Sequence, residues 1–193
     1  MRRRRRSRRG WRAWSIATAL LLVLCGGFWL GVRGPDNLHA VADGMVYRSA
    51  QMDAATLRHT IREKGIKAIL NLRGEKPGSN WYRKEMEAAQ AADVLLLNHG
   101  LSAQREVSPD ELEDVLRLMD RAPKPLLVHC EGGSDRTGLV IAAWVFSRGH
   151  RPTEEAYKQL SLRYGHFPYL WSNTDAMDKS FWNYVRQAAG TPR

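Results

Sequence analysis

Cysteine is scarce in this sequence, which has only Cys25 and Cys130 among 193 residues. Cys25 lies in an apolar run and Cys130 lies in a glycine-containing stretch, so we expect no disulfide bond between them. Nowhere do cysteine and histidine residues take the spacing of zinc ligands. The sequence therefore predicts neither a disulfide framework nor a metal site.

Most of the chain has no excess of basic residues, although the formal net charge of the whole sequence is +10. Eight of the 30 basic residues lie within the first 14 positions and Arg33 is a ninth, which leaves 21 basic and 20 acidic residues from position 34 onward. A nearly neutral globular part lacks the basic surface that nucleic acids require. We therefore exclude nucleic acid as a partner.

Charge is absent altogether from residues 15–32, an 18-residue stretch just long enough to cross a bilayer as a helix. Trp11, Trp14 and Trp29 lie near its ends, which is typical of interfacial anchors. The alternative is a cleaved signal peptide, but the small-residue triplet at 40–42 lies eight residues beyond the run. We predict a single transmembrane anchor at 15–32, after a basic segment at 1–14 and before a linker at 33–40.

The charges on either side of this predicted anchor favour one orientation. Eight arginines precede the run, whereas Arg33 and Arg48 are the only basic residues in the twenty that follow it, 33–52. The positive-inside rule then keeps the N-terminus in the cytoplasm and sends the following domain across the membrane. In a bacterium that domain would be periplasmic.

Strands and helices alternate in the remainder, residues 41–193, which we interpret as one globular domain. Short apolar runs predict strands at 66–72, 94–97 and 126–128. Capping and stop signals predict helices at 53–64, 79–92, 108–122, 139–146, 153–164 and 174–188. The alternation predicts an α/β fold with a mostly parallel central sheet of about four to five strands and helices on both faces.

The most informative stretch is 129–138, which reads His-Cys-Glu-Gly-Gly-Ser-Asp-Arg-Thr-Gly between a predicted strand and a predicted helix. Backbone N–H groups and the helix dipole make such a loop an anion site. Cys130 within it would be stabilised as the thiolate, the nucleophilic form. Five residues separate Cys130 from Arg136, enough to wrap a tetrahedral phosphate that the guanidinium grips with two hydrogen bonds.

This signature resembles that of the cysteine-dependent protein tyrosine and dual-specificity phosphatases, most closely the dual-specificity-like branch with a His-Cys-x-x-Gly-x-Asp-Arg-Thr-Gly loop. The resemblance covers about residues 41–170 and implies the cysteine-phosphatase fold. It implies a metal-independent and cofactor-independent phosphomonoester hydrolase that acts through a phosphocysteine intermediate. Cys130 would be the nucleophile, and the phosphate would be bound by the loop residues Glu131, Gly132, Gly133, Ser134, Asp135, Arg136 and Thr137.

The proton donor is the residue that the sequence identifies least well. Most dual-specificity enzymes carry an aspartate about thirty residues before the cysteine, but here residues 98–106 contain none. Asp135, inside the loop, is our first choice of general acid, and Glu106 and His99 are the alternatives. Asp135 could instead orient Arg136 or cap the following helix.

Several readings stay open at this stage. The chain could be a catalytically weak phosphate-binding module, because the usual acid is absent, or a rhodanese-like sulfurtransferase. Arg48 could reach the active site or form a structural ion pair. Phosphotyrosine, phosphoproteins, and phospholipid or inositide headgroups all fit the loop as substrates. Glu131 and Gly133 occupy positions that are basic in several inositide-directed relatives, which disfavours a highly phosphorylated inositol.

Overall fold

The computed structural model describes residues 8–169 and 173–190 of the chain, which divides into two units, Met1–Pro35 and Asp36–Arg193. The described part of the first unit is one helix, α1 (Arg8–Arg33). Among the described residues, no helix is long and apolar enough to cross a membrane. The anchor predicted at 15–32 is therefore not supported, although its residues are helical. Residues 1–7 of the predicted basic segment, and the side chain of Cys25, lie outside what is described.

The second unit is an α/β domain that begins at Asp36, earlier than the predicted start at residue 41. Its strands and helices follow in chain order: β1 (His39–Ala42), β2 (Val46–Ser49), α2 (Ala54–Lys64), β3 (Ala68–Asn71), α3 (Asn80–Ala91), β4 (Leu95–Asn98), α4 (Pro109–Arg121), β5 (Leu126–His129), α5 (Asp135–Ser147), α6 (Thr153–Tyr157) and α7 (Asp175–Gly190). Short 3₁₀ turns lie at Pro35–Asn37 and Leu162–Tyr164. The first of these turns and half of β1 occupy the predicted linker, 33–40.

The five strands form one sheet in the order β1-β2-β5-β3-β4. β1 is antiparallel to β2, and the other three pairings are parallel, which confirms the predicted mostly parallel sheet. The register aligns the last residues of four strands in one row: Ser49, His129, Asn71 and Asn98. The segments that leave these strands therefore meet at one edge of the sheet, where open α/β sheets bind ligands.

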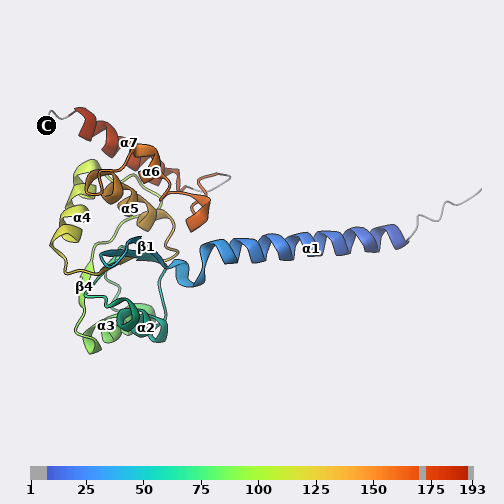
Figure 1. Ribbon diagram of the computed structural model, residues 1–193, viewed down its shortest axis with the longest axis horizontal. Helices are drawn as coiled ribbons and strands as arrows, with labels where there is room; N and C mark the ends of the chain where they lie inside the picture. The colour runs from blue at the N-terminus through green and yellow to red at the C-terminus, as the bar shows by residue number, and fades with distance from the viewer. Residues whose placement is uncertain (1–7, 170–172, 191–193) are drawn as a thin grey trace, which may run out of the picture. The chain divides into compact units, whose positions relative to one another are not determined.

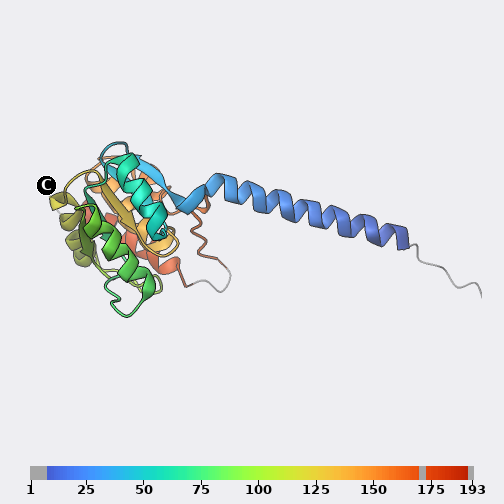
Figure 2. The same cartoon turned by 90° about the horizontal axis from the view of Figure 1, so that it is seen from below.

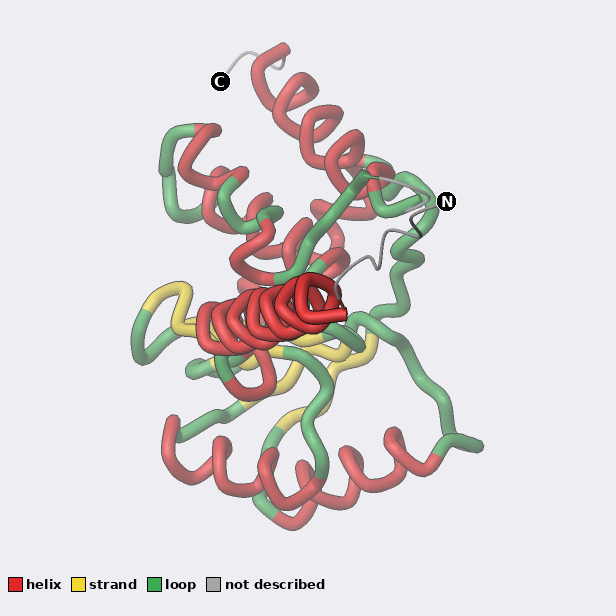
Figure 3. Tube along the Cα trace, turned by 90° about the vertical axis from the view of Figure 1, so that its right-hand side faces the viewer, coloured by secondary structure: helices red, strands yellow, loops and turns green. Residues whose placement is uncertain are grey.

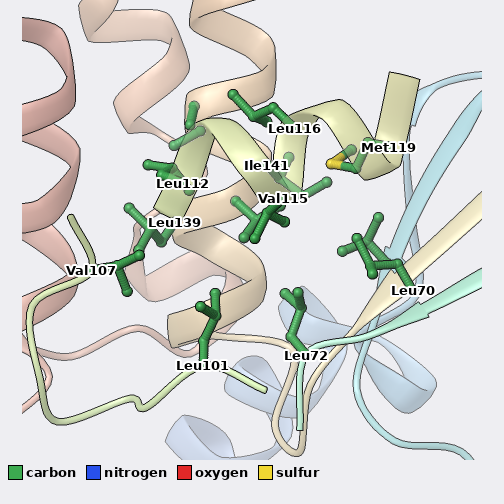
Figure 4. Close-up of a cluster of buried hydrophobic side chains, with 14 of the residues drawn as sticks. Leu70, Leu72, Leu101, Val107, Leu112, Val115, Leu116, Met119, Leu139 and Ile141 are labelled. Atoms are coloured by element: carbon green, nitrogen blue, oxygen red, sulfur yellow. The ribbon is translucent and has the colours of Figure 1, made fainter. Parts of the chain in front are cut away.

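Helices cover both faces of the sheet (Figures 1 and 3), with α2 and α3 side by side on one face (Figure 2). Successive strand residues point to opposite faces: Leu126 and Val128 pack with α4, α5 and α7, whereas Leu127 packs with α2 and α3. Four apolar residues of α4 at helical spacing are fully buried against the sheet and α5 (Figure 4): Leu112, Val115, Leu116 and Met119.

Side-chain caps are present at the predicted starts of α2 and α4, whereas Ser79 at the start of α3 makes no capping hydrogen bond. The Asp53 carboxylate accepts hydrogen bonds from the amides of Ala55 and Thr56, and Gly65 ends α2 in the left-handed conformation. The Ser108 hydroxyl accepts from the amide of Glu111 at 3.2 Å, with Pro109 in the first turn of α4. These caps stabilise helix ends by satisfying amides that have no partner within the helix.

The helix predicted at 153–164 is shorter than expected, because α6 ends at Tyr157. A carbonyl just beyond its end, that of Gln159, accepts a hydrogen bond from Arg48 at 2.9 Å. A Cβ atom on Gly138 of α5 would lie 2.9 Å from the same oxygen. Tertiary contacts therefore hold this backbone where the local pattern favours a longer helix.

Candidate active site

Strand β5 and helix α5 are joined by the five-residue loop Cys130–Ser134, which we call the anion loop. Cys130 is 2 % exposed, and it directly follows His129 at the row of strand ends. Thr137, in the first turn of α5, is fully buried. The predicted strand–loop–helix is thus present, with Cys130 at its first position and Arg136 just inside the helix.

The carbonyl groups of the anion loop point away from its interior and bind the surrounding protein. The oxygen of Glu131 accepts from the amide of Gln51 at 3.1 Å, and that of Gly132 accepts from Asn37 Nδ2 at 3.0 Å. The oxygen of Gly133 accepts from Arg48 Nη2 at 2.7 Å. In a trans peptide the next N–H points opposite to the carbonyl, so three successive amides are directed toward the loop interior.

Arg48, on β2, is fully buried and binds the anion loop through the carbonyl oxygen of Gly133. Its Nη1 donates to both the backbone and side-chain oxygens of Gln159, at 2.9 and 2.7 Å, and its guanidinium lies 3.7 Å from the ring centre of Tyr164. Burial lowers the pKa of Arg48 to about 10, against the opposing influence of Tyr164 and Cys130. Arg48 therefore binds carbonyl oxygens in place of the carboxylate expected for an ion pair.

Gly133 allows the anion loop to approach β2 closely. Its φ is +69°, and a Cβ atom there would lie 2.6 Å from the oxygen of Ser49 and from the amide nitrogen of Ala50. Both the backbone conformation and the close approach exclude a side chain at this position. The glycine predicted as a phosphate-binding residue thus also fixes the loop against the sheet.

Arg136 is aimed by two backbone oxygens that leave the sheet edge. Its Nη1 lies 3.4 Å from the carbonyl oxygens of Leu72, after β3, and Leu101, after β4. The side chains of both leucines are buried in the cluster beneath α4 (Figure 4), so core packing places these oxygens. Arg136 Nε and Thr137 Oγ1 are buried without a hydrogen-bond partner among the described residues, as expected of donors reserved for an anion.

Ser134 and Asn37 fasten the anion loop to the segment after α6. The Ser134 hydroxyl donates to the carbonyl of Tyr164 at 2.7 Å, and Asn37 Nδ2 donates to the same oxygen at 2.9 Å. The side chain of Ser134 thus supports the loop from outside, which leaves its amide for phosphate.

Asp135, our first choice of general acid, is paired with a buried histidine. Its Oδ1 lies 2.7 Å from His166 Nδ1, and the other ring nitrogen of His166 lies 3.0 Å from Asp178 Oδ2 on α7. Burial lowers the pKa of His166, but the hydrogen bonds and charges of the two aspartates outweigh it and raise the pKa to about 9. Asp135 is therefore engaged in a contact with the His166 ring on the side of α5 and α7.

The two alternative acids have partners of their own. Glu106 accepts a hydrogen bond from Asn183 on α7 at 3.1 Å. His99, just after β4, lies 3.9 Å from Glu111, and its backbone amide donates to Asn71. Neither contact connects these side chains to the anion loop, so the identity of the acid stays a prediction.

The rim beside Cys130 carries opposite charges. The Glu131 side chain is 72 % exposed, and its carboxylate lies 3.8 Å from Arg73, the residue after Leu72. The Arg73 guanidinium stacks 3.7 Å from the ring centre of Trp81 and donates to Gln51 Oε1 at 3.3 Å. This contact partly offsets the negative charge of Glu131 at the loop entrance.

Sequence reasoning missed Asn37 and Gln51 as supports of the site. It also missed Glu85 on α3, whose carboxylate lies 2.6 Å from His129 and accepts from Gln51 Nε2 at 3.3 Å. It did not identify His166 as the partner of Asp135. Asn37 has φ of +51° and is 1 % exposed, and neither property has a signature in the sequence. His166 lies 31 residues from Asp135. A buried polar residue becomes visible only when the fold brings its partner close.

Comparisons with known proteins agree with this geometry. Residues 32–173, more than half of the chain, match the family described as DSP-PTPase phosphatase fused to NAD+ kinase. A curated relative, the inositol diphosphatase DSP1 of Oryza sativa subsp. japonica, is 28 % identical over 117 residues. That match covers 58 % of this chain, and the chain spans about half the length of that relative, 50 %.

Solved structures share the fold at low sequence identity. TpbA of P. aeruginosa, in complex with pTyr, has a TM-score of 0.59 at 21 % identity, covering 78 % of this chain and 91 % of that one. The core catalytic domain of the PP-IP phosphatase SIW14 of S. cerevisiae has a TM-score of 0.61 at 19 % identity, covering 80 % and 91 %. Together with the cysteine–arginine loop, the family match shows that this chain belongs to the DSP-PTPase family of cysteine-based dual-specificity phosphatases.

Proposed function

We propose that the chain hydrolyses phosphomonoesters without a metal ion, with Cys130 as nucleophile. One observation carries the proposal: three successive carbonyls of the anion loop are bound from outside, so that three amides are directed inward beside Cys130 and Arg136. Such preorganised donors stabilise the charge on the equatorial oxygens of a phosphoryl group in the transition state.

The reaction proceeds in two steps. The Cys130 thiolate attacks phosphorus, the bond to the ester oxygen breaks, and the leaving oxygen takes a proton from a general acid. Water then attacks the phosphocysteine, giving inorganic phosphate and the regenerated thiolate, and its proton passes to a base. Arg136 and the loop amides bind the phosphoryl oxygens throughout.

The substrate we propose is a singly phosphorylated group of the phosphotyrosine type. The exposed carboxylate of Glu131 at the loop entrance repels additional phosphates, and Arg73 offsets this charge only partly at 3.8 Å. Among the similar proteins, TpbA is described with pTyr, whereas the rice and yeast proteins are described as inositol diphosphatase and PP-IP phosphatase. The alternative substrates for this chain are therefore inositides.

A substrate panel on the full chain tests both the metal-free mechanism and the proposed substrate class. We expect turnover of p-nitrophenyl phosphate and phosphotyrosine peptides in EDTA, inhibition by vanadate, and no turnover by Cys130→Ser. Glu131→Lys should raise kcat/KM for inositol polyphosphates relative to phosphotyrosine. Activity that disappears in EDTA and returns with a divalent ion would contradict the metal-free mechanism. Binding of vanadate without turnover of even an aryl phosphate would favour a phosphate-binding module.

We separately propose that the catalytic unit lies on the far side of the membrane from the cytoplasm, in the periplasm of a bacterium. This proposal rests on the arginine distribution alone. Alkaline phosphatase fused after Arg193 would be active if the unit is exported. An inactive fusion at normal expression, with a fluorescent cytoplasmic reporter at the same point, would place the unit inside the cell.

A further inference from the structure

Asn71, the last residue of β3, is a polar side chain that is fully buried at the carboxyl edge of the sheet. A buried amide without partners costs free energy, so its hydrogen bonds indicate what it holds in place. Asn71 Oδ1 accepts from the backbone amide of Arg73 at 2.9 Å, and Asn71 Nδ2 donates to the carbonyl oxygen of Gly74 at 3.1 Å. Asn71 thus fixes the backbone of the two residues that follow Leu72.

Asn98, the last residue of β4, extends this network to α3. Its Oδ1 accepts a second hydrogen bond from Asn71 Nδ2 at 2.9 Å, and its Nδ2 donates to the Tyr82 hydroxyl at 2.9 Å. Tyr82 is a buried residue of α3. The ends of the neighbouring strands β3 and β4 are therefore joined through their side chains as well as through backbone pairing.

The segments that leave β3 and β4 stay together beyond the strands. The amide of Leu101 donates to the carbonyl oxygen of Leu72 at 3.1 Å. Gly74 has φ of +74°, and a Cβ atom there would lie 2.9 Å from the Cα atom of Gly100. Because the two backbones are in contact and hydrogen-bonded, a shift of one segment displaces the other.

These two segments carry the oxygen atoms that hold Arg136. The Nη1 atom of this arginine lies 3.4 Å from the carbonyl oxygens of both Leu72 and Leu101. Arginine grips a phosphate with two parallel N–H groups, which requires the plane of the guanidinium to be set correctly. The position of the two carbonyl groups therefore controls how Arg136 faces an anion.

We propose that Asn71 and Asn98 are positioning residues of the reaction. They fix the two carbonyl groups described above and so direct Arg136 toward the phosphoryl oxygens. The inference rests on the proposed function, because it concerns how the same site binds phosphate. In this mechanism the asparagines act through the backbone alone, without contact with the substrate and without transfer of a proton.

The first test compares Asn98→Ala with Asn80→Ala in the full chain, with p-nitrophenyl phosphate as substrate. Asn98 is half-buried and pairs with Asn71, whereas Asn80 is exposed at the start of α3. We expect Asn98→Ala to lower kcat/KM by at least about 10-fold, since a misplacement of about 1 Å costs up to about 100-fold. Asn80→Ala should match the wild type. A wild-type kcat/KM in Asn98→Ala would overturn the proposal.

A double-mutant cycle with Arg136→Lys separates orientation of Arg136 from general damage to the fold. Lysine keeps the positive charge but lacks the planar group that the two carbonyls orient. If Asn98 acts through Arg136, then Asn98→Ala should change the remaining kcat/KM of Arg136→Lys by less than about 2-fold, the ordinary limit of additivity. A loss as large as in the wild-type background would overturn the proposal, because Asn98 would then act on the fold alone.

Tyr82→Phe takes the place of Asn98→Ala in the same cycle if that variant does not fold. It removes only the hydroxyl group to which Asn98 donates. A loss of kcat/KM that disappears in the Arg136→Lys background supports the proposal, whereas no loss, or an equal loss in both backgrounds, overturns it. Activity that survives Cys130→Ser would instead contradict the proposed function, so the two failures are distinguishable.

Discussion

Asp135 Oδ1 and His166 Nδ1 lie 2.7 Å apart, in a contact that joins the start of α5 to the segment after α6. Asp178 binds the opposite nitrogen of the ring and also accepts a hydrogen bond from the Tyr157 hydroxyl at 2.5 Å. The imidazolium between two carboxylates fixes the side chain that precedes Arg136. We infer that Asp135 orients the loop and its arginine more than it donates a proton.

Replacement of Asp135 by asparagine tests this inference through the leaving group. We expect kcat to fall by a similar factor for p-nitrophenyl phosphate and for an alkyl phosphate, because orientation affects both equally. A general acid is worth roughly 10²–10⁴-fold, mostly where the leaving oxygen is basic. A loss confined to the alkyl phosphate would restore Asp135 as the acid. A selective loss in Glu106→Gln or His99→Ala would move that role there.

The pH dependence of stability provides a second test, on His166. Its folded pKa, about 9, lies above the ordinary value of 6.5. The stabilisation from the protonated ring is therefore fully present below about pH 6.5 and is lost as pH rises through 9. His166→Gln should lower stability by about 2 kcal/mol at pH 7, because two partly exposed carboxylates lose their hydrogen bonds to a cation.

The same variant should then lose less stability than the wild type between pH 7 and pH 10, measured by thermal or urea unfolding. His59→Gln, at an exposed histidine of α2, is the matched control and should follow the wild type at every pH. Parallel curves for His166→Gln and the wild type across this range would show that the ring carries no extra proton in the folded state.

Gly133→Ala tests the contact between the anion loop and β2. An added methyl group would lie 2.6 Å from backbone atoms of Ser49 and Ala50 at a positive φ, so the loop must move. We expect kcat/KM to fall at least about 100-fold, since misplacement by about 1 Å is enough for such a loss. Gly78→Ala, where a Cβ meets nothing within 4 Å, is the control and should keep full activity. Wild-type kinetics in Gly133→Ala would contradict the close approach.

The strand–loop–helix at 126–147 and the caps of α2 and α4 could be predicted because their signals are local. Each of these signals depends only on neighbouring residues: the apolar runs, the caps at Asp53 and Ser108, and the spacing of Cys130 and Arg136. β1 and β2 were not among the predicted strands. β1 is partly exposed and lacks an apolar run, so its pairing with β2 depends on the fold.

The supports of the site could not be predicted because they are polar residues made internal by distant partners. Arginine and glutamate are usually found at the protein surface, and nothing near Arg48 or Glu85 in the chain indicates that they are buried. The oxygen atoms that Arg48 binds are 85 and 111 residues away, and Glu85 on α3 lies 2.6 Å from His129 on β5. The nucleophile was therefore easier to identify than the groups that position it.

The measurement that tests the central claim most directly is the capture of the covalent intermediate. The full chain is mixed with p-nitrophenyl phosphate in EDTA, quenched within the first turnover, and digested for mass spectrometry. We predict a phosphoryl group on Cys130 in the wild type and none in Cys130→Ser, which should also be inactive. Steady hydrolysis by Cys130→Ser, or a wild-type enzyme that turns over with Cys130 never phosphorylated, would contradict the account.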